Sequence, residues 1–211
     1  MRKTEIEKTD ILRAAAQVIE LYGTDGLNAR SVARQLGVST QPVYSRFKSM
    51  EGLVQAMREE GARLYRCKID EFLRDKDHNR YQAYGMGFVR FAREEKGFFR
   101  ILYLVPTQGG GYFRVQDPYF NEIVEEIQRS YGMERELAER FHTEMAIFSF
   151  GLAALVNFGN LDLSEDEISL RLKRQFYAQY ALYYPEQAAH MRSFANQAEE
   201  QLCKMQSKSN T

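Results

Sequence analysis

Residues 37–47 of this chain read GVSTQPVYSRF, and they decide the fold of its N-terminal part. A short amphipathic stretch, Ala29 to Leu36, precedes them and ends at Gly37. Two short helices joined by a tight turn that contains glycine form the basic plan of a helix-turn-helix. The second helix of such a unit lies in the major groove of DNA, so the pattern predicts a DNA-binding head.

The residues that open the second helix suit contacts with DNA. Ser39 and Thr40 carry hydroxyl groups beside the positive end of the helix dipole, where a phosphate is favoured. Gln41 has an amide that can bond N6 and N7 of adenine together, and Pro42 offers an apolar surface to a thymine methyl group. We therefore expect this end of the helix to read bases.

The rest of the helix divides into an outer and an inner face. Tyr44 can direct its hydroxyl group to the DNA backbone, and Arg46 and Lys48 can neutralise phosphates. Val43 and Phe47 are expected to face the core instead and to hold the helix against the rest of the head.

Length and composition describe a globular protein. A chain of 211 residues suggests one or two domains, and a hydrophobic fraction of 44% allows a sizeable core. The 29 basic and 29 acidic residues balance, so the whole chain has no polyanion-binding signature. Residues 1–50 nevertheless carry eight basic against five acidic side chains, a mild positive excess on the predicted head.

Several classes of protein are disfavoured by the pattern. Cys67 and Cys203 lie in no CxxC or Cys/His cluster, so we expect free thiols, no metal site and no cofactor. The longest apolar run, 145–158, is interrupted by polar residues and falls short of the ~18–20 residues of a membrane span. The charged N-terminus carries no export signal. A cytoplasmic protein without a membrane partner is predicted.

Helical spacing of apolar residues dominates the chain, and no alternating strand pattern is evident, so the predicted fold is all-α. In the first helix the inward residues are Ile11, Ala15, Val18, Ile19 and Tyr22. The start signals of the four helices at the N-terminal end are a Thr4–Glu7 capping box, Asn28, Ser39 and Ser49. The fourth helix, with Leu53, Met57, Leu64, Ile69 and Phe72 inward, extends to about Arg74 and would be about 38 Å long. It links the head, residues 1–50, to a helical body, residues 51–211.

The body is predicted to be a bundle of helices. A helix covers 80–95, and the apolar piece 98–105 is assigned as helical because no partner strand is evident. A glycine-containing loop spans 106–117, and Asp117 and Pro118 open the next helix as N-cap and first residue. Long apolar helices follow at 134–159 and 165–184, the second with a Ser164–Glu167 capping box. A polar final helix is expected after Pro185, ending near residue 205.

The span from Ile11 to Leu53 resembles the DNA-binding domain of the TetR family of bacterial regulators. The resemblance rests on Ile11-Leu12, Ala15-Ala16, Gly23, Gly26, Asn28, Val32-Ala33, Gly37-Val38-Ser39, Tyr44, Phe47 and Leu53. The body resembles the family in its helical pattern, with segments 88–92 and 98–100 similar to those of some members. The resemblance implies a two-domain, all-helical homodimer, in which a small molecule bound to the body changes the spacing of the two heads.

The resemblance also implies a set of DNA contacts. The family's usual contact positions fall on Asn28, Arg30, Ser39, Thr40, Gln41, Tyr44 and Arg46. The chain departs from the family at Gln41-Pro42, where many members have a small pair, and at Arg46, where many have histidine. Met50 stands where many have a phosphate-contacting lysine, and Lys48 is the nearby replacement for that charge. These departures bear on the operator sequence rather than on the binding mode.

The body is expected to hold a ligand pocket and a dimer surface. Aromatic residues and one histidine on an apolar helix are the pocket candidates, although the pattern does not divide pocket from core: Tyr84, Phe88, Phe99, Tyr103, Phe120, His142 and Phe148. The dimer candidates lie on the two long apolar helices: Ser149, Leu152, Ala153, Val156, Leu172, Phe176 and Tyr180. An effector with apolar surface would suit such a pocket.

Three functions remain open at this stage. The first is a ligand-responsive transcriptional regulator, expected to be a repressor, that binds double-stranded DNA as a homodimer on a palindromic operator. The second is a helical small-molecule-binding or interaction protein whose head no longer reads DNA. The third is a small all-α enzyme, which is disfavoured because no HExxH, GxSxG or paired-carboxylate motif is present.

Overall fold

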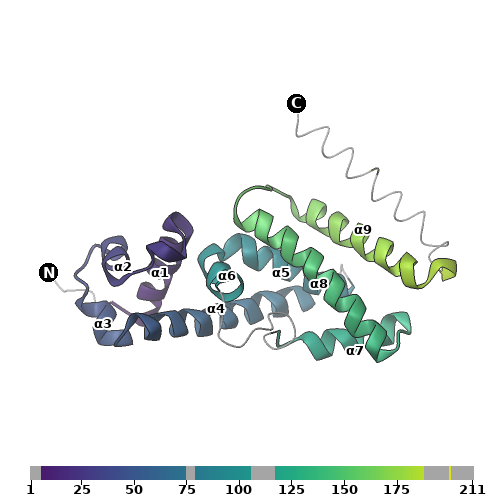
Figure 1. Cartoon of the computed structure of the whole chain (residues 1–211), viewed down its shortest axis with the longest axis horizontal. Coiled ribbons are helices and arrows are strands. Elements are labelled where there is room, and N and C mark those ends of the chain that lie inside the picture. Colours follow the sequence, from purple (N-terminus) through teal and green to yellow (C-terminus); the bar gives the residue numbers. More distant parts are fainter. Residues whose placement is uncertain (1–5, 75–78, 106–116, 188–199, 201–211) are drawn as a thin grey trace. The chain divides into compact units, whose positions relative to one another are not determined.

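The computed structural model describes residues 6–74, 79–105, 117–187 and 200, and every regular element in these ranges is helical (Figure 1). The elements are α1 Lys8–Tyr22, the 3₁₀ turn η1 Thr24–Gly26, α2 Ala29–Leu36, α3 Gln41–Phe47, α4 Met50–Leu73, α5 Arg80–Glu94, α6 Lys96–Tyr103, α7 Phe120–Tyr131, α8 Arg135–Asn157 and α9 Glu165–Tyr183. The predicted all-α fold is thereby confirmed, including a helix at the apolar piece 98–105. Most of the predicted glycine loop and of the last helix lies outside the described residues.

Three predicted helix caps are confirmed by hydrogen bonds. The Asn28 side chain accepts from the N–H groups of Arg30 and Ser31 at 3.1 and 3.0 Å. The Ser49 hydroxyl accepts from the Gly52 N–H at 3.1 Å. Ser164 and Glu167 form the predicted reciprocal capping box at the start of α9.

Three other helices begin later than predicted. At α1 the Glu7 N–H donates to the Asp10 carboxylate at 3.0 Å, so the cap lies one turn beyond the predicted Thr4–Glu7 box, and Thr4 is outside the described residues. Helix α3 begins at Gln41, with no side-chain capping bond at Thr40. Helix α7 begins at Phe120, because Asp117 first forms a turn in which it accepts the Tyr119 N–H at 2.9 Å.

The chain folds as two compact units, each discontinuous in sequence. The first contains Met1–Cys67 and Phe91–Gly110, and the second contains Lys68–Arg90 and Gly111–Thr211. The long helix α4 contributes to both units, and so does α5. Helix α6 belongs to the first unit, together with the helix-turn-helix.

The core of the first unit lies between α1 and the elements around it. Ile11, Ala15, Val18 and Ile19 are buried as predicted, whereas Tyr22 is 66% exposed, so the apolar face of α1 ends at Ile19. On α4 it is Tyr65, rather than the predicted Leu64, that is buried. The Tyr65 ring lies 5.6 Å from Phe91 and 6.2 Å from Tyr103, and aromatic packing therefore decides which face of α4 turns inward.

Helix α6 packs against α1 through a close backbone contact and several polar contacts. A Cβ atom on Gly97 would lie 2.1 Å from the Ala16 carbonyl oxygen, so the two helices cross at the distance that only glycine allows. Arg100 donates to the carbonyls of Ile19 and Glu20, each at 3.0 Å, and so satisfies the C-terminal end of α1. Three contacts surround the crossing: the ion pairs Arg13–Glu95 and Lys96–Glu20, and the Arg13 guanidinium over the Phe98 ring.

The second unit buries an aromatic core formed by residues of α5, α7, α8 and α9. Phe141 on α8 packs edge-on against Phe176 on α9, with ring centroids 5.2 Å apart. The buried Gln179 amide donates to the Phe141 carbonyl at 3.0 Å. In the part of the chain that the structure describes, none of the helices has the length and apolar character needed to cross a lipid bilayer.

Candidate functional site

The turn between α2 and α3 is set by glycine and by the cap of α2. Gly37 has φ +68° and ψ 31°, a left-handed conformation that glycine adopts without strain. The Val38 N–H donates back to the Ala33 carbonyl at 3.0 Å, which closes the end of α2. Val32 and Ala33 are buried beneath this turn, so the direction in which α3 leaves is fixed.

Helix α3 is held by two buried side chains and exposes its opposite face. Val43 is 1% and Phe47 8% exposed, as the sequence predicts. The residues predicted to meet DNA lie on the outer side: Ser39, Gln41, Tyr44, Lys48 and Arg30 are exposed, and Thr40, Pro42 and Arg46 are half-buried. The Tyr44 side chain is 50% exposed, so its ring and hydroxyl are available on the outer face of α3.

Asn28, the remaining predicted contact, already uses its side-chain amide. Its oxygen caps α2, and its Nδ2 donates to the Gly26 carbonyl at 3.2 Å. Ser31 completes this cap by accepting the Asn28 N–H at 3.1 Å. In the structure, therefore, the Asn28 side chain fixes the start of α2, next to the exposed Arg30.

The joint between α3 and α4 is a tight turn centred on Lys48. Lys48 has φ +63° and ψ −42°, and the Ser49 N–H donates to the Phe47 carbonyl at 2.7 Å. This is a γ-turn of the strained kind, in a region that non-glycine residues rarely occupy. The turn leaves the Lys48 side chain exposed at the C-terminal end of α3.

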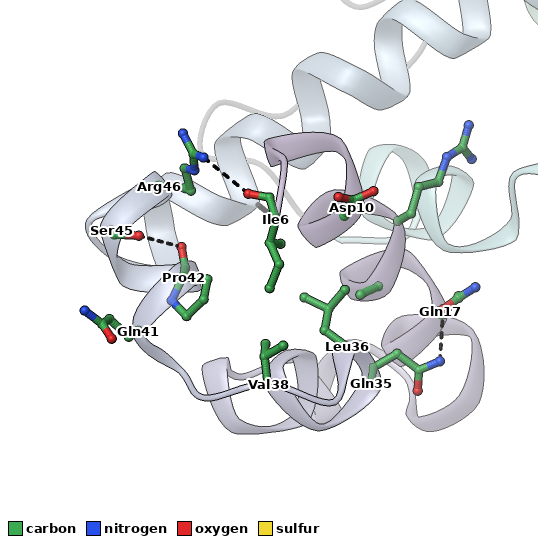
Figure 2. A pocket seen from close by; sticks show the side chains of 12 residues that line it. Ile6, Asp10, Gln17, Gln35, Leu36, Val38, Gln41, Pro42, Ser45 and Arg46 are labelled. Atoms are coloured by element: carbon green, nitrogen blue, oxygen red, sulfur yellow. Dashed lines mark hydrogen bonds between the residues drawn. The ribbon is translucent and has the colours of Figure 1, made fainter. Parts of the chain in front are cut away.

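A hollow of about 780 Å³ lies on one flank of α3, between α1 and the α2–α3 turn (Figure 2). Apolar side chains of Ile6, Leu36, Val38 and Pro42 line it, and the Gln17 and Gln35 amides bond across one end at 2.9 Å. Arg46 Nη2 donates to the Ile6 carbonyl at 3.3 Å on another side. Sequence reasoning missed Ile6, because no periodicity marks a residue that precedes its helix.

Three of the seven predicted pocket residues, His142 and two aromatic residues beside it, lie together in the second unit. The His142 ring lies 5.7 Å from the Tyr84 ring and 5.3 Å from the Phe120 ring. His142 Nδ1 is 3.2 Å from the hydroxyl of the buried Tyr81, which sequence reasoning did not single out. Burial lowers the pKa of His142 to about 4, so the ring is neutral at pH 7.

Two carboxylates extend this cluster. Tyr84 donates its hydroxyl to Asp117, and the Tyr119 hydroxyl donates to Asp70 at 2.7 Å. Of the other pocket candidates, Phe88 is buried and Phe148 half-buried. Phe99 and Tyr103 belong to the first unit, where their rings pack 5.2 Å apart.

The neutral His142 should make the stability of the protein fall in acid. The unfolded chain gains the proton near pH 6.5, whereas the folded pKa is about 4, so the unfolded state binds it first as the pH falls. We expect the unfolding free energy to drop by about 3 kcal/mol between pH 7 and pH 4 through this group, at about 1.4 kcal/mol per pH unit. Urea unfolding of wild type and His142→Phe at several pH values measures it: between pH 7 and pH 4 the wild type should lose about 3 kcal/mol more unfolding free energy than the variant, which lacks the imidazole. Parallel pH profiles would contradict this assignment.

The seven residues predicted for the dimer surface are all buried within the single chain, each at 9% exposure or less. Their apolar spacing serves the packing of α8 and α9 inside the second unit. A different stripe of apolar residues is exposed: Ile147 and Leu155 on α8 and Phe158 at its C-cap are 52%, 44% and 54% exposed. Gly151 lies between them, and a Cβ atom there would meet nothing within 4 Å.

Comparisons with known proteins agree with this architecture. Residues 11–57 match the family model of the bacterial regulatory proteins of the tetR family. No curated protein matches the sequence. Among solved structures, a TetR-like transcriptional regulator from Rhodococcus sp. RHA1 is 16% identical, with a TM-score of 0.69 over 85% of this chain and 99% of that one.

Two further solved structures share the fold. A protein with unknown function from Rhodococcus sp. RHA1 is 21% identical, with a TM-score of 0.62 over 83% of this chain and 96% of that one. The multidrug binding protein EbrR, complexed with imidazole, is 15% identical, with a TM-score of 0.51 over 81% of this chain and 95% of that one. The family match covers the helix-turn-helix whose exposed α3 face is described above, so residues 11–57 resemble the DNA-binding domain of the tetR family of bacterial regulatory proteins, and the chain as a whole shares the fold of TetR-like regulators.

Proposed function

We propose that the protein is a cytoplasmic, homodimeric repressor that binds a roughly palindromic operator and leaves it when a small molecule binds the second unit. The observation that carries the proposal is the outer face of α3. Its hydrogen-bonding side chains, Gln41 and Tyr44 among them, are exposed, while Val43 and Phe47 anchor the helix. In a dimer, two such helices would read half-sites about 34–36 Å apart, one turn of DNA.

The test is a fluorescence-anisotropy titration against duplexes tiled from the region upstream of the protein's own gene, at two salt concentrations. Selective binding should weaken with salt by roughly 0.9 log units per log unit of salt for each phosphate neutralised. Equal, weak binding to every duplex would favour the second candidate, a helical interaction protein whose head does not read DNA. The half-buried Met50, at a position where the family often has a phosphate-contacting lysine, is the observation behind that alternative.

Gln41→Ala should relax base preference at one position of each half-site. The lost bidentate contact is worth roughly 1–3 kcal/mol of discrimination. Competition titrations with single-base variants of the operator measure the change. Gln55→Ala, which removes another exposed glutamine in the same unit, is the matched control and should leave discrimination intact. An unchanged base profile in Gln41→Ala would show that Gln41 is not a reader.

The cluster around His142 is our candidate for the effector site. The rings of Tyr81, Tyr84 and Phe120 surround the imidazole, which is neutral, and this composition suits a ligand with flat, apolar surface. EbrR, which shares the fold, is described as multidrug binding. Binding of DNA and effector should be antagonistic and reciprocal, and a coupling of about 1–3 kcal/mol gives roughly 5–150-fold relief of binding. A Tyr84→Ala variant should keep DNA binding and lose that relief.

A further inference from the structure

Helix α3 is joined to α4 by two residues, Lys48 and Ser49. The Lys48 N–H donates to the Tyr44 carbonyl at 2.9 Å as the last backbone bond of α3. The Leu53 N–H donates to the Ser49 carbonyl at 3.1 Å as the first backbone bond of α4. Each residue of this joint is thereby bonded into one of the two helices. Because a residue has only two soft backbone torsion angles, φ and ψ of these two residues set the angle between α3 and α4.

Lys48 holds the joint in a strained conformation. Of the residues that the structure describes, Lys48 alone has a positive φ without being a glycine, at +63°. An L-residue in this region brings its Cβ atom close to its own backbone, so the conformation persists only where the surrounding structure enforces it. A retained outlier of this kind is grounds for a functional hypothesis.

Gly52, in the first turn of α4, leaves the space that this joint occupies. The Phe47 carbonyl accepts the Ser49 N–H in the turn at 2.7 Å, and a Cβ atom on Gly52 would lie 2.2 Å from the same carbonyl oxygen. Gly52 does not itself have a positive φ. Since glycine is unfavourable inside a helix, what position 52 contributes is the absence of a side chain.

The two helices are anchored on either side of the joint. Val43 and Phe47 bury the inner face of α3, at 1% and 8% exposure, and Leu53 in the first turn of α4 is fully buried. The outer face of α3, with Gln41 and Tyr44, is therefore presented at the angle that the turn sets.

We propose that Lys48 and Gly52 are positioning residues for DNA reading: the strained turn at Lys48, which a side chain at position 52 would displace, fixes the angle at which α3 presents its outer face to bases. This inference rests on the proposed DNA-binding function. It gives Lys48 a role through its backbone that is separate from the charge of its side chain, because the charge acts on phosphates and the angle acts on base selectivity.

The first test is Gly52→Ala in the full chain, and it measures selectivity as the ratio of affinities for the tightest duplex of the tiled set and for an unrelated duplex of equal length. The added methyl group displaces the Phe47 carbonyl while every charge of the head stays in place. Selectivity should fall by roughly 5–150-fold, the span that corresponds to the usual cost of such strain. Affinity for the unrelated duplex, which depends on charge, should be unchanged.

Gly61→Ala is the matched control on the same helix. Its added Cβ atom would also meet a close neighbour, the Leu102 side chain at 3.1 Å, but far from the joint in sequence. It should change the melting temperature at most and leave selectivity intact.

The second test separates backbone from charge at position 48. K48G and K48V remove the same charge, so their salt slopes should be equal. Glycine adopts a positive φ without strain, whereas a β-branched valine does not. K48V should therefore be less selective than K48G by roughly 5–150-fold and should melt at a lower temperature. The pair Q55G and Q55V, at an exposed position inside α4, should be equally selective.

The outcomes separate this inference from the proposed function. A wild-type protein that binds no duplex selectively removes both. Selective wild-type binding with equal selectivity in K48G and K48V, or with full selectivity in G52A, overturns the positioning role alone. An equal loss in G61A and G52A overturns it too, because overpacking anywhere on α4 would then suffice. Circular dichroism at the assay temperature gives the folded fraction to which affinities are normalised, and K48A replaces a K48V that does not fold, with the same order against K48G expected.

Discussion

Gly97→Ala is expected to destabilise the protein by roughly 3 kcal/mol, the upper end of the usual cost of overpacking. The added Cβ atom would stand 2.1 Å from the Ala16 carbonyl oxygen, and the backbone of α1 would have to move away from α6. That movement would also lengthen the bonds from Arg100 to the end of α1. Thermal unfolding at a fixed protein concentration should show a Tm lower by roughly 6–12 °C.

The same substitution at Gly151 is the matched control, and both Gly→Ala changes are compared in the Leu155→Glu background described below, where the stripe of α8 that includes Gly151 meets no second subunit. Gly151 lies on the exposed face of α8 with open space around its Cβ position, so alanine there should stabilise by roughly 0.5–1 kcal/mol through helix propensity. The two Gly→Ala changes should therefore shift Tm in opposite directions. If both variants shifted Tm by the same amount, the backbones of α1 and α6 would have to be further apart at Gly97 than they are in the structure.

Leu155→Glu is expected to convert the proposed homodimer to a monomer and to weaken operator binding more than a hundredfold. Leu155 is the central apolar side chain of the exposed stripe on α8, between Ile147 and Phe158. In a two-fold interface the same residue occurs on both subunits, so each change places two carboxylates in an apolar contact. Two heads joined in one dimer gain ~10²–10⁴ in avidity over one head, and the monomer forfeits that gain.

Light scattering after gel filtration measures the mass, and the anisotropy titration measures the affinity. Leu21→Glu makes the same change at a leucine that is 62% exposed on α1 and should alter neither the mass nor the fold. If Leu155→Glu keeps the mass of the wild type, the dimer contact does not lie on this stripe of α8.

The head was largely predictable from sequence because its signals are local. Asn28 caps α2 through its own neighbours, and Gly37 permits the left-handed turn before α3. Helical spacing was enough to separate the buried Val43 and Phe47 from the exposed Gln41 and Tyr44. Each of these features depends on residues within a few positions of one another.

The features that sequence did not reveal depend on partners distant in the chain. Tyr81 lies sixty-one residues from His142, and Arg46 lies forty from Ile6. The stripe of apolar residues that packs α8 internally and the stripe that stays exposed have the same helical spacing, so periodicity does not distinguish them. The exposed fractions in the structure distinguish the two stripes, because Leu152 is 7% and Leu155 is 44% exposed.

The first unit is built from two separate stretches of the chain, so the ribosome must make both stretches before the unit can be completed. The helix-turn-helix is complete in sequence before residue 50, but Gly97 and its neighbours in α6 pack against the face of α1 that carries Ala16. During translation this face stays uncovered until α6 has left the ribosome, so a nascent head remains dependent on a segment made about fifty residues later. A fragment that stops after the family-matched region, residues 11–57, would lack this contact permanently, so we expect the helix-turn-helix to be less stable without α6.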